Sequence, residues 1–481
     1  MEKSRGTEAL VALEDAAPDV LFETVPGTDI QLWPLLRWPV ARSMAAAELN
    51  THSVRRTATR RDLLERAVRR HLPNPYASSR LRSPATALFV VDGGTFASVP
   101  EGRKNWLVDD HALVIPGSVV LQERARDLCT RRADRPTFPR TFSFEDSAAD
   151  VRDLSRSSPP SAAVVAFAHS AIAEVYRRLE FHVDEAGMAE TRRQLMVRLA
   201  RAPHTLRYFT RIIDRVRPQI AFVQTGSYGD RSHLISALKQ HGTHVAEHQH
   251  GWIGPSHGAY NFGDAMRHPA LARTIPDTLL TFGDFWSRNI RFPGAMVAVG
   301  KPHLEMQARA TLPHTDRDHV VMIVSSVFAR EELTRFALAV RDLLPANWRV
   351  TLRPHPSERA SVETLYSGLM GEDRVSFDLE PDVYVSLGTV RGVIGLASTV
   401  LYEALAMDCK VHVKDSPLAD LYIDDSFFGE RLTDGASLRR AIAGIVSEET
   451  TNSEPNSRGI LDTVWKPNTI ANFERFVDDV L

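Results

Sequence analysis

Cysteine is nearly absent from this chain of 481 residues, which contains only Cys129 and Cys409. Two cysteines so far apart exclude a disulfide framework and a cysteine-ligated zinc site, and they predict a reducing, cytoplasmic location. Long apolar runs are missing too, because no stretch reaches the roughly 18 consecutive apolar residues of a membrane span. The first residues are acidic and polar, unlike a signal peptide. We therefore expect a protein that neither crosses a membrane nor is exported by a classical signal.

Neither sign of charge dominates, since 58 Lys and Arg stand against 60 Asp and Glu. The overall charge therefore gives no reason to expect a nucleic-acid partner. The segment 54–72 is a local exception that carries seven arginines around apolar positions. It predicts a basic amphipathic helix, which either touches the anionic inner face of the plasma membrane or packs on its own domain with a solvated basic face. The second arrangement is the usual one for such a helix.

Short apolar runs alternate with helical patterns along most of the chain, and this alternation predicts parallel, doubly wound sheets. The expected strands are 85–91, 112–115, 219–224, 243–247, 278–282, 296–299, 319–324, 348–352, 393–395 and 410–413. The fold class is α/β of the GT-B type, with two Rossmann-like domains whose sheets face a central cleft. The predicted domains are 1–305 on the acceptor side with a helical N-terminal extension, 306–460 for the nucleotide donor, and a helix in 461–481 that packs back toward the first domain.

In open parallel sheets, ligands bind beyond the carboxyl ends of the strands. The second half of the chain places the turn Arg353-Pro354-His355-Pro356 at such an end. Arginine can grip phosphate oxygens through paired N–H groups, and His355 can donate to another oxygen. Ser326 ends the first strand of this half, where a small hydroxyl residue lets a phosphate approach the backbone.

A second candidate for nucleotide binding is the segment that opens the helix 398–407. Ser398 or Thr399 can cap this helix, and the free N–H groups of its first turn could also hold a phosphate. Glu403 lies one turn further on the same face as Thr399, where its carboxylate could accept the ribose hydroxyls. Phosphate donors followed by a ribose acceptor indicate a nucleotide site.

In the first half, the loop His248-Gln249-His250-Gly251 follows a predicted strand. No third ligand has a recognisable metal spacing, so we predict no metal and no cofactor beyond the substrate itself. His250 can instead act as the base that removes a proton from an attacking hydroxyl. Asp230, Asp92 and Asp264 are rival bases, and a merely structural loop histidine is the remaining alternative.

The residues of the first half that would contact the acceptor, or shape the loop around it, are Gln249, Gly251 and Tyr228. These residues lie in the two polar loops 224–230 and 248–258, which each follow an expected strand.

Over about 219–413, the sequence resembles bacterial surface-polysaccharide glycosyltransferases of the GT-B fold. The motifs that carry the resemblance are QHG at 249–251, the passage 276–303, RPHP at 353–356 and STxxxEALA at 398–406. They are similar to those of capsule polymerases, sialyltransferases and teichoic-acid polymerases. The resemblance implies a CMP- or CDP-linked donor held at His355, Ser398 and Thr399, with Arg353 and Ser326 assisting. It also implies that Glu403 holds the ribose and that His250 is catalytic on the acceptor side.

The predicted function is a metal-independent, inverting transfer of a sugar or alditol phosphate to a hydroxyl of a growing surface polysaccharide. The expected partners are therefore a nucleotide-activated sugar and an oligosaccharide or polysaccharide acceptor. Two alternatives stay open. One is an enzyme like UDP-N-acetylglucosamine 2-epimerase, and the other is a non-catalytic scaffold of a polysaccharide-assembly complex.

Overall fold

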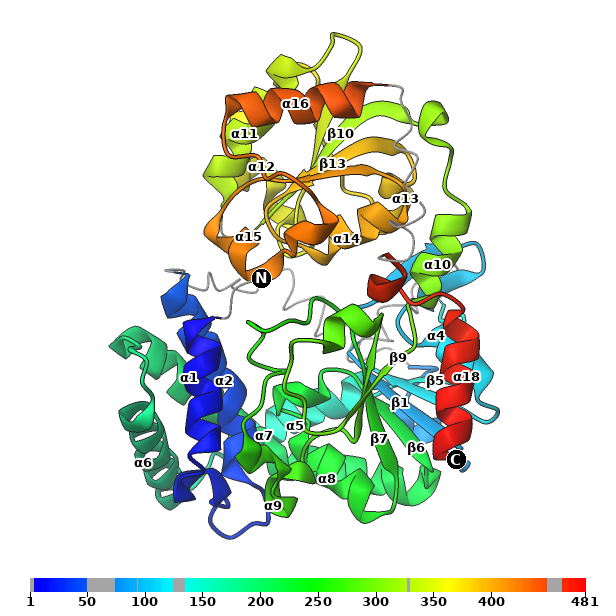
Figure 1. Cartoon of the computed structure of the whole chain (residues 1–481). Helices are drawn as coiled ribbons and strands as arrows, with labels where there is room; N and C mark the ends of the chain where they lie inside the picture. The colour runs from blue at the N-terminus through cyan, green and yellow to red at the C-terminus, as the bar shows by residue number, and fades with distance from the viewer. Residues whose placement is uncertain (1–3, 50–73, 93, 124–134, 327–328, 448–460) are drawn as a thin grey trace. The chain divides into compact units, whose positions relative to one another are not determined.

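The computed structural model describes residues 4–49, 74–92, 94–123, 135–326, 329–447 and 461–481 (Figure 1). The chain divides into two compact units. The N-terminal unit comprises Lys3–Thr281, Asn289–Val299 and Ile470–Leu481, and the C-terminal unit comprises Phe282–Arg288 and Gly300–Thr469. The domain limits predicted from the sequence, at residues 305 and 460, stay a prediction.

The N-terminal unit is built on a parallel sheet with the strand order β5-β4-β1-β6-β7-β8-β9. Strands such as β1 (ALFVV) and β6 (IAFV) are buried along their whole length, as expected of parallel strands covered on both faces. The strands are β1 Ala87–Val91, β4 Val119–Gln122, β5 Thr141–Ser143, β6 Ile220–Val223, β7 His244–His248, β8 Thr278–Thr281 and β9 Ala295–Ala298. A small antiparallel hairpin, β2 Phe96–Val99 and β3 Gly102–Asn105, stands apart from this sheet.

Alternate residues of β1 supply the two faces of this sheet, as the period of a strand requires. Leu88 and Val90 lie in one apolar cluster with the C-terminal turns of α7 (Glu185–Val216), whereas Phe89 lies in another cluster with Phe473 of α18 (Thr469–Val480). The last helix of the chain therefore covers one face of the first sheet. Among the residues that the structure describes, the other α-helices of this unit are α1 Arg5–Asp15, α2 Leu32–Glu48, α4 Asp109–Val114, α5 Glu145–Ser157, α6 Ala162–Arg178, α8 Ser232–Gln240 and α9 Pro269–Ala272.

The C-terminal unit has a second parallel sheet, in the order β12-β11-β10-β13-β14. Its strands are β10 Asp318–Val324, β11 Arg349–Arg353, β12 Val375–Phe377, β13 Val390–Gly395 and β14 Lys410–Val413. Apolar residues of α11 (Arg330–Leu343) and α16 (Gly435–Val446) form a core with β10, β11 and β13. Further α-helices in the described part of this unit include α10 Pro302–Arg309, α12 Val362–Leu365, α13 Val383–Leu387, α14 Thr399–Ala406 and α15 Pro417–Tyr422.

The predicted fold class, two Rossmann-like α/β domains with parallel sheets of the GT-B type, is confirmed by these strand orders. One predicted strand is wrong, because residues 112–115 lie at the end of α4, which has Asp109 and Asp110 in its first turn. Acidic residues stabilise the start of a helix, and the strand comes later, after the left-handed Gly117. The predicted basic helix 54–72 lies outside the described residues. Within the described part of the chain, none of the helices has the length and apolar character needed to span a membrane.

Candidate functional site

The loops that follow β10, β11 and β13 meet at one edge of the C-terminal sheet. Val324 pairs with Arg353 on one side and with Gly395 on the other, so these three strands end level with one another. Parallel strands are about 4.8 Å apart, so the turn after β11 and the loop after β13 begin roughly 10 Å from each other. This edge is where an open α/β sheet binds its ligand. The structure thus brings together the strand ends that carry the predicted donor-binding residues.

A buried carboxylate, Glu358, organises the turn that follows β11. The hydroxyl of Ser325 donates to Glu358 at 2.6 Å, the hydroxyl of Tyr366 at 3.1 Å and the backbone N–H of His355 at 3.1 Å. Arg330 forms an ion pair with the other carboxylate oxygen at 2.5 Å. Burial acts to raise the pKa of Glu358, but the hydrogen bonds from Ser325 and Arg330 outweigh it and lower this pKa below its usual value. Glu358 was missed in the sequence, although its place three residues after the strand-end histidine was a visible signal.

The imidazole of His355 is held in one tautomer. The backbone N–H of Ser357 donates to Nδ1 at 3.2 Å, and the Ser357 hydroxyl lies 2.7 Å from the same nitrogen. A backbone amide can only donate, so Nδ1 carries no proton and the neutral ring has its proton on Nε2. Partial burial lowers the pKa of His355, which keeps the ring neutral at pH 7. The exposed His355 therefore offers one N–H donor, suited to a phosphate oxygen.

The guanidinium of Arg353 already has partners within its own unit. It forms an ion pair with Asp378, and it donates to the carbonyl of Glu380 at 2.8 Å and to the Ser386 hydroxyl at 3.3 Å. Only 5% of Arg353 is exposed. Its predicted phosphate contact stays a prediction, and a ligand would have to share this guanidinium with Asp378. The arginine that the sequence analysis overlooked is Arg359, whose Nε is buried without a hydrogen-bond partner in the described chain.

Burial lowers the pKa of Arg359, and the neighbouring charge of Arg353 lowers it further, while the charges of Asp378 and Glu380 partly oppose this effect. Arg359 also lies near enough to His355 for its charge to lower the pKa of that imidazole. Burial destabilises the positive charge of Arg359, and a bound anion would stabilise it. Arg359 is therefore a better placed candidate for a phosphate contact than Arg353.

Ser398 caps α14, as the sequence predicted for that segment. Its hydroxyl accepts from the backbone N–H of Val400 at 3.1 Å, and Thr399 is the first residue of the helix. Ser398 and Thr399 are both partly exposed, so the positive end of the helix dipole at this edge is accessible to an anion. Ser326 is buried at the end of β10, between this loop and the turn that contains His355.

Glu403 forms a buried ion pair that the sequence did not reveal. Its carboxylate lies 2.6 Å from the ammonium group of Lys301, and about 6% of each side chain is exposed. The ammonium group also lies 5.0 Å from the ring centre of Phe282 and 5.8 Å from that of Trp465. The predicted contact between Glu403 and ribose stays a prediction, and it would require this carboxylate to serve Lys301 and a ligand together.

In the N-terminal unit, the loop after β7 is fixed by a buried glutamine. Gln249 is fully buried, and its side-chain amide donates to the carbonyl of Gly251 at 2.9 Å. Its backbone N–H also donates to the carbonyl of Leu280 in β8 at 2.8 Å. Gln249 and Gly251 are thus brought together, and their hydrogen bond spans His250, which lies between them in the sequence.

His250 lies in surroundings that keep it neutral. Burial lowers the pKa of His250, and the negative charge of Asp92 partly opposes this effect. Its Nδ1 is buried with no hydrogen-bond partner in the described chain, and its ring centre lies 5.7 Å from that of Tyr228. A neutral imidazole is the form that a general base requires. The catalytic role of His250 stays a prediction. Among the rival bases, Asp92 is the one whose negative charge raises the pKa of His250.

Tyr228 is held by His257. The backbone N–H of Ala259 donates to Nδ1 of His257 at 3.2 Å, so the ring proton lies on Nε2 and is donated to the Tyr228 hydroxyl at 3.2 Å. The ring of Trp38 packs on Tyr228 edge-on, with centres 4.4 Å apart. Tyr228 therefore has a defined position next to His250, as a residue that contacts an acceptor would need.

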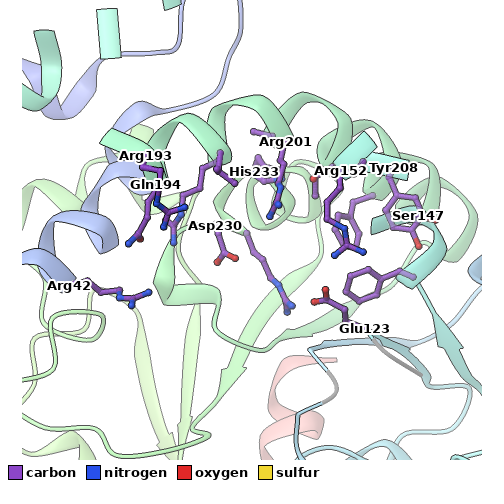
Figure 2. A pocket seen from close by; sticks show the side chains of 18 of the residues that line it. Arg42, Glu123, Ser147, Arg152, Arg193, Gln194, Arg201, Tyr208, Asp230 and His233 are labelled. Carbon is purple, nitrogen blue, oxygen red and sulfur yellow. The ribbon is translucent and has the colours of Figure 1, made fainter. Parts of the chain in front are cut away.

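Asp230 is not among the residues that the structure places around His250. It is exposed and lines a cavity of about 540 Å³, whose lining residues do not include His250 (Figure 2). The two predicted catalytic residues thus lie in different parts of the N-terminal unit. Asp230 lines this cavity, whereas His250 lies in the loop after β7. Among the residues that the structure describes, no group of three or more histidine, cysteine, aspartate or glutamate side chains is arranged to hold a metal ion.

The chain matches no protein-family model, and no curated protein matches it. Solved structures with a similar course of the chain include a UDP-GlcNAc 2-epimerase from Methanocaldococcus jannaschii in complex with UDP-GlcNAc and UDP. It is 10% identical, with a TM-score of 0.45 over 82% of this chain and 99% of that one. Another is a UDP-GlcNAc 2-epimerase from Neisseria meningitidis bound to UDP-GlcNAc. It is 12% identical, with a TM-score of 0.43 over 82% of this chain and 98% of that one.

Proposed function

We propose that the protein is a nucleotide-sugar-dependent enzyme whose C-terminal unit binds the nucleotide phosphate. The observation that carries this proposal is the pairing of two anion-binding features at one sheet edge. One is the Nε2–H donor of His355, with Arg359 beside it, and the other is the start of α14 at Thr399. A neutral N–H donor, a guanidinium and a helix N-terminus together suit a phosphate group and need no metal ion.

The reaction that we propose is an inverting transfer from a CMP- or CDP-linked donor to a hydroxyl of a surface polysaccharide. His250 takes the hydroxyl proton while the hydroxyl oxygen bonds to the activated atom of the donor. The bond from this atom to the leaving phosphate breaks, and the phosphate oxygen keeps the electron pair. His355, Arg359 and the start of α14 stabilise that negative charge. The cytoplasm is the proposed location, with a peripheral contact at the plasma membrane through residues 54–72.

Nucleotide binding is tested by titrating the full chain with CMP, CDP, UDP and GDP in a calorimeter. A hydrogen bond to a charged group contributes about 1.5–3 kcal/mol, so His355→Ala should weaken binding roughly 10- to 100-fold. His319→Ala is the matched control, because His319 lies in β10 near the amino end of the same sheet, stacked on Trp348. Equal affinities of the wild-type protein and His355→Ala would contradict the assignment, and no binding of any nucleotide would favour the scaffold.

The type of reaction is tested by incubating a nucleotide sugar with the protein, with and without an oligosaccharide acceptor. A transferase forms product only with the acceptor, and His250→Gln should remove most of its turnover while leaving nucleotide affinity unchanged. Conversion of UDP-N-acetylglucosamine to its 2-epimer without an acceptor would replace the transferase proposal by the epimerase alternative.

A further inference from the structure

The cavity that contains Asp230 lies at the carboxyl edge of the first sheet, within the N-terminal unit. Glu123 directly follows β4, Phe144 follows β5, and Asp230 follows β6, while a long stretch of α7 forms one wall. Figure 2 shows the side chains of these elements around a common hollow. Its volume of about 540 Å³ is in the range of small-molecule binding sites. Position and size therefore both fit a ligand site.

The lining of this cavity is strongly basic. Six arginines stand against three carboxylates in the described lining, an excess of three positive charges in a protein whose formal net charge is −2. The arginines are Arg42, Arg152, Arg193, Arg198, Arg201 and Arg231, and the carboxylates are Glu123, Glu190 and Asp230. The lining of the cavity therefore carries a local excess of positive charge.

Three of these arginines have partners within the protein. Arg193 forms an exposed ion pair with Glu190. Arg198 donates to the carbonyl of Leu35 at 3.0 Å and to that of Tyr228 at 3.1 Å. Arg231 likewise donates to backbone carbonyls, those of Val90 and Gln224. Neutral carbonyls hold the guanidinium groups of Arg198 and Arg231 in place without neutralising their charge.

The other three arginines have no such partners. In the described chain, no hydrogen bond or ion pair engages the guanidinium groups of Arg42, Arg152 or Arg201. Burial lowers the pKa of Arg201, and the positive charge of Arg152 lowers it further, while the negative charges of Glu123 and Asp230 partly oppose this effect. Like charges held together in a cavity repel one another, and an anion that enters between them removes this repulsion.

His233 is an independent sign of a ligand. It lines the cavity and only 7% of it is exposed, yet neither ring nitrogen has a hydrogen-bond partner in the described chain. Buried polar groups are normally hydrogen-bonded, and one without a partner needs an explanation. A ligand in the cavity would provide the missing partner.

We propose that this cavity binds a hydroxyl-bearing organic anion, of the class of sugar phosphates or sugar acids. The anionic group bonds to Arg152 and Arg201, because guanidinium groups bind phosphate and carboxylate oxygens in pairs. The hydroxyls donate to the carboxylates of Asp230 and Glu123, and His233 contributes a further hydrogen bond. This site is independent of the function proposed above, because all its residues belong to the N-terminal unit and none is part of the nucleotide site.

The test is a calorimetric titration of the full chain with glucose 6-phosphate, glucuronate, inorganic phosphate and glucose. We expect glucose 6-phosphate or glucuronate to bind and glucose not to bind; which of the two binds more tightly identifies the anionic group. Arg152→Ala and Arg201→Ala should each weaken binding at least tenfold, because each removes a charged hydrogen-bond donor. Both guanidinium groups lack partners in the described chain, so these variants should keep the wild-type melting temperature.

Arg211→Ala is the matched control, since Arg211 is an exposed arginine of α7 that does not line the cavity. It should bind the probes as the wild-type protein does, and so should His355→Ala, whose change lies in the other unit. The proposal is overturned if neither sugar anion binds, if glucose binds equally well, or if Arg201→Ala and Arg152→Ala retain full affinity. Failure of nucleotide binding would leave this result unaffected.

Discussion

Breaking the buried ion pair between Lys301 and Glu403 should destabilise the C-terminal unit more than breaking an exposed pair. The two groups are 2.6 Å apart, and about 94% of each side chain is withdrawn from water. The ring of Tyr384, with its centre 5.3 Å from the ammonium group, is one of the aromatic side chains around the cation. Replacing Lys301 by Met keeps most of the side-chain volume but leaves the Glu403 carboxylate buried without its counter-ion.

Removing one partner of a buried ion pair typically costs about 3–5 kcal/mol, because the remaining charge stays out of water. For a unit of this size, such a loss lowers the melting temperature by roughly 10 °C. The double variant Lys301→Met with Glu403→Leu should recover most of this loss, because no charge then remains buried. Burying the pair is itself costly, so we expect the double variant to approach the wild-type stability.

The assay is urea unfolding of the full chain, followed by the fluorescence of its tryptophans, for the two single variants and the double variant. Arg440→Met is the control, because Arg440 and Glu430 form an ion pair at 2.7 Å with about 62% and 64% of their side chains exposed. An exposed pair contributes at most about 1 kcal/mol. If Lys301→Met destabilises the protein no more than Arg440→Met does, the reasoning from burial is refuted.

A further variant, Glu403→Gln, separates a structural role of Glu403 from the predicted ribose contact. Glu403→Gln keeps an oxygen that can accept from Lys301 and removes only the negative charge. If Glu403 holds ribose, the affinity for CMP should fall more than the stability does. If Glu403 serves Lys301 alone, stability should fall while the affinity of the folded protein for CMP stays the same.

Three further predictions concern the N-terminal unit. Gly229 and Gly242 both have a left-handed backbone, with φ near +80°, but a Cβ at Gly229 would lie 1.8 Å from the carbonyl oxygen of Pro34, whereas a Cβ at Gly242 meets open space. Gly229→Ala should therefore destabilise the protein by several kcal/mol more than Gly242→Ala, whose cost is about 1–2 kcal/mol, in urea unfolding. Burial lowers the pKa of His111 to about 4. Between pH 6.5 and pH 4 the unfolded chain therefore takes up a proton at this residue while the folded protein does not, so the free energy of unfolding decreases as the pH falls through this range. His111→Phe should flatten the stability profile in this range by about 1.4 kcal/mol per pH unit, and an unchanged slope would contradict it. Burial raises the pKa of Glu247 to about 7, so the free energy of unfolding decreases as the pH rises from about 4.5 to 7. Glu247→Gln should remove this decrease, which is measured by comparing urea unfolding at pH 5 and pH 8.

The strands could be predicted because each buried parallel strand is a local apolar run, as in β1, β6 and β10. The error at 112–115 shows the limit of this signal. The apolar residues there fit a strand and a short helix equally well, and the acidic residues just before them settle the matter in favour of α4. The three-residue strands β5 and β12 were missed, because a segment that short has no readable period.

For the candidate site, the sequence could show which loops follow strands, but it could not show which charges meet. His355 and Ser398 lie at the same sheet edge because their strands are in register with β10. The partner of Glu403, in contrast, is 102 positions away in the sequence, and that of Arg353 is 25 positions away. Such pairs are created by tertiary packing, and no local pattern indicates them. Polar residues at strand ends can therefore be located from the sequence, whereas their state of pairing cannot.

Each unit has a buried glutamate at or near the carboxyl end of a strand, Glu247 within β7 and Glu358 in the turn after β11, but the two carboxylates are in opposite electrostatic situations. Glu358 has Arg330 as a counter-ion and a lowered pKa, so it remains a charged acceptor for the backbone of His355 across the physiological range. Glu247 accepts from the Ser227 N–H at 2.8 Å and from the Tyr260 hydroxyl at 2.8 Å, with no ion pair in the described chain, and its pKa is raised to about 7. The carboxylate of Glu358 therefore keeps its charge near neutral pH, whereas the carboxylate of Glu247 changes its charge there. The pH profile of activity should therefore include the titration of Glu247 near pH 7, in addition to that of His250, whose pKa is lowered by burial.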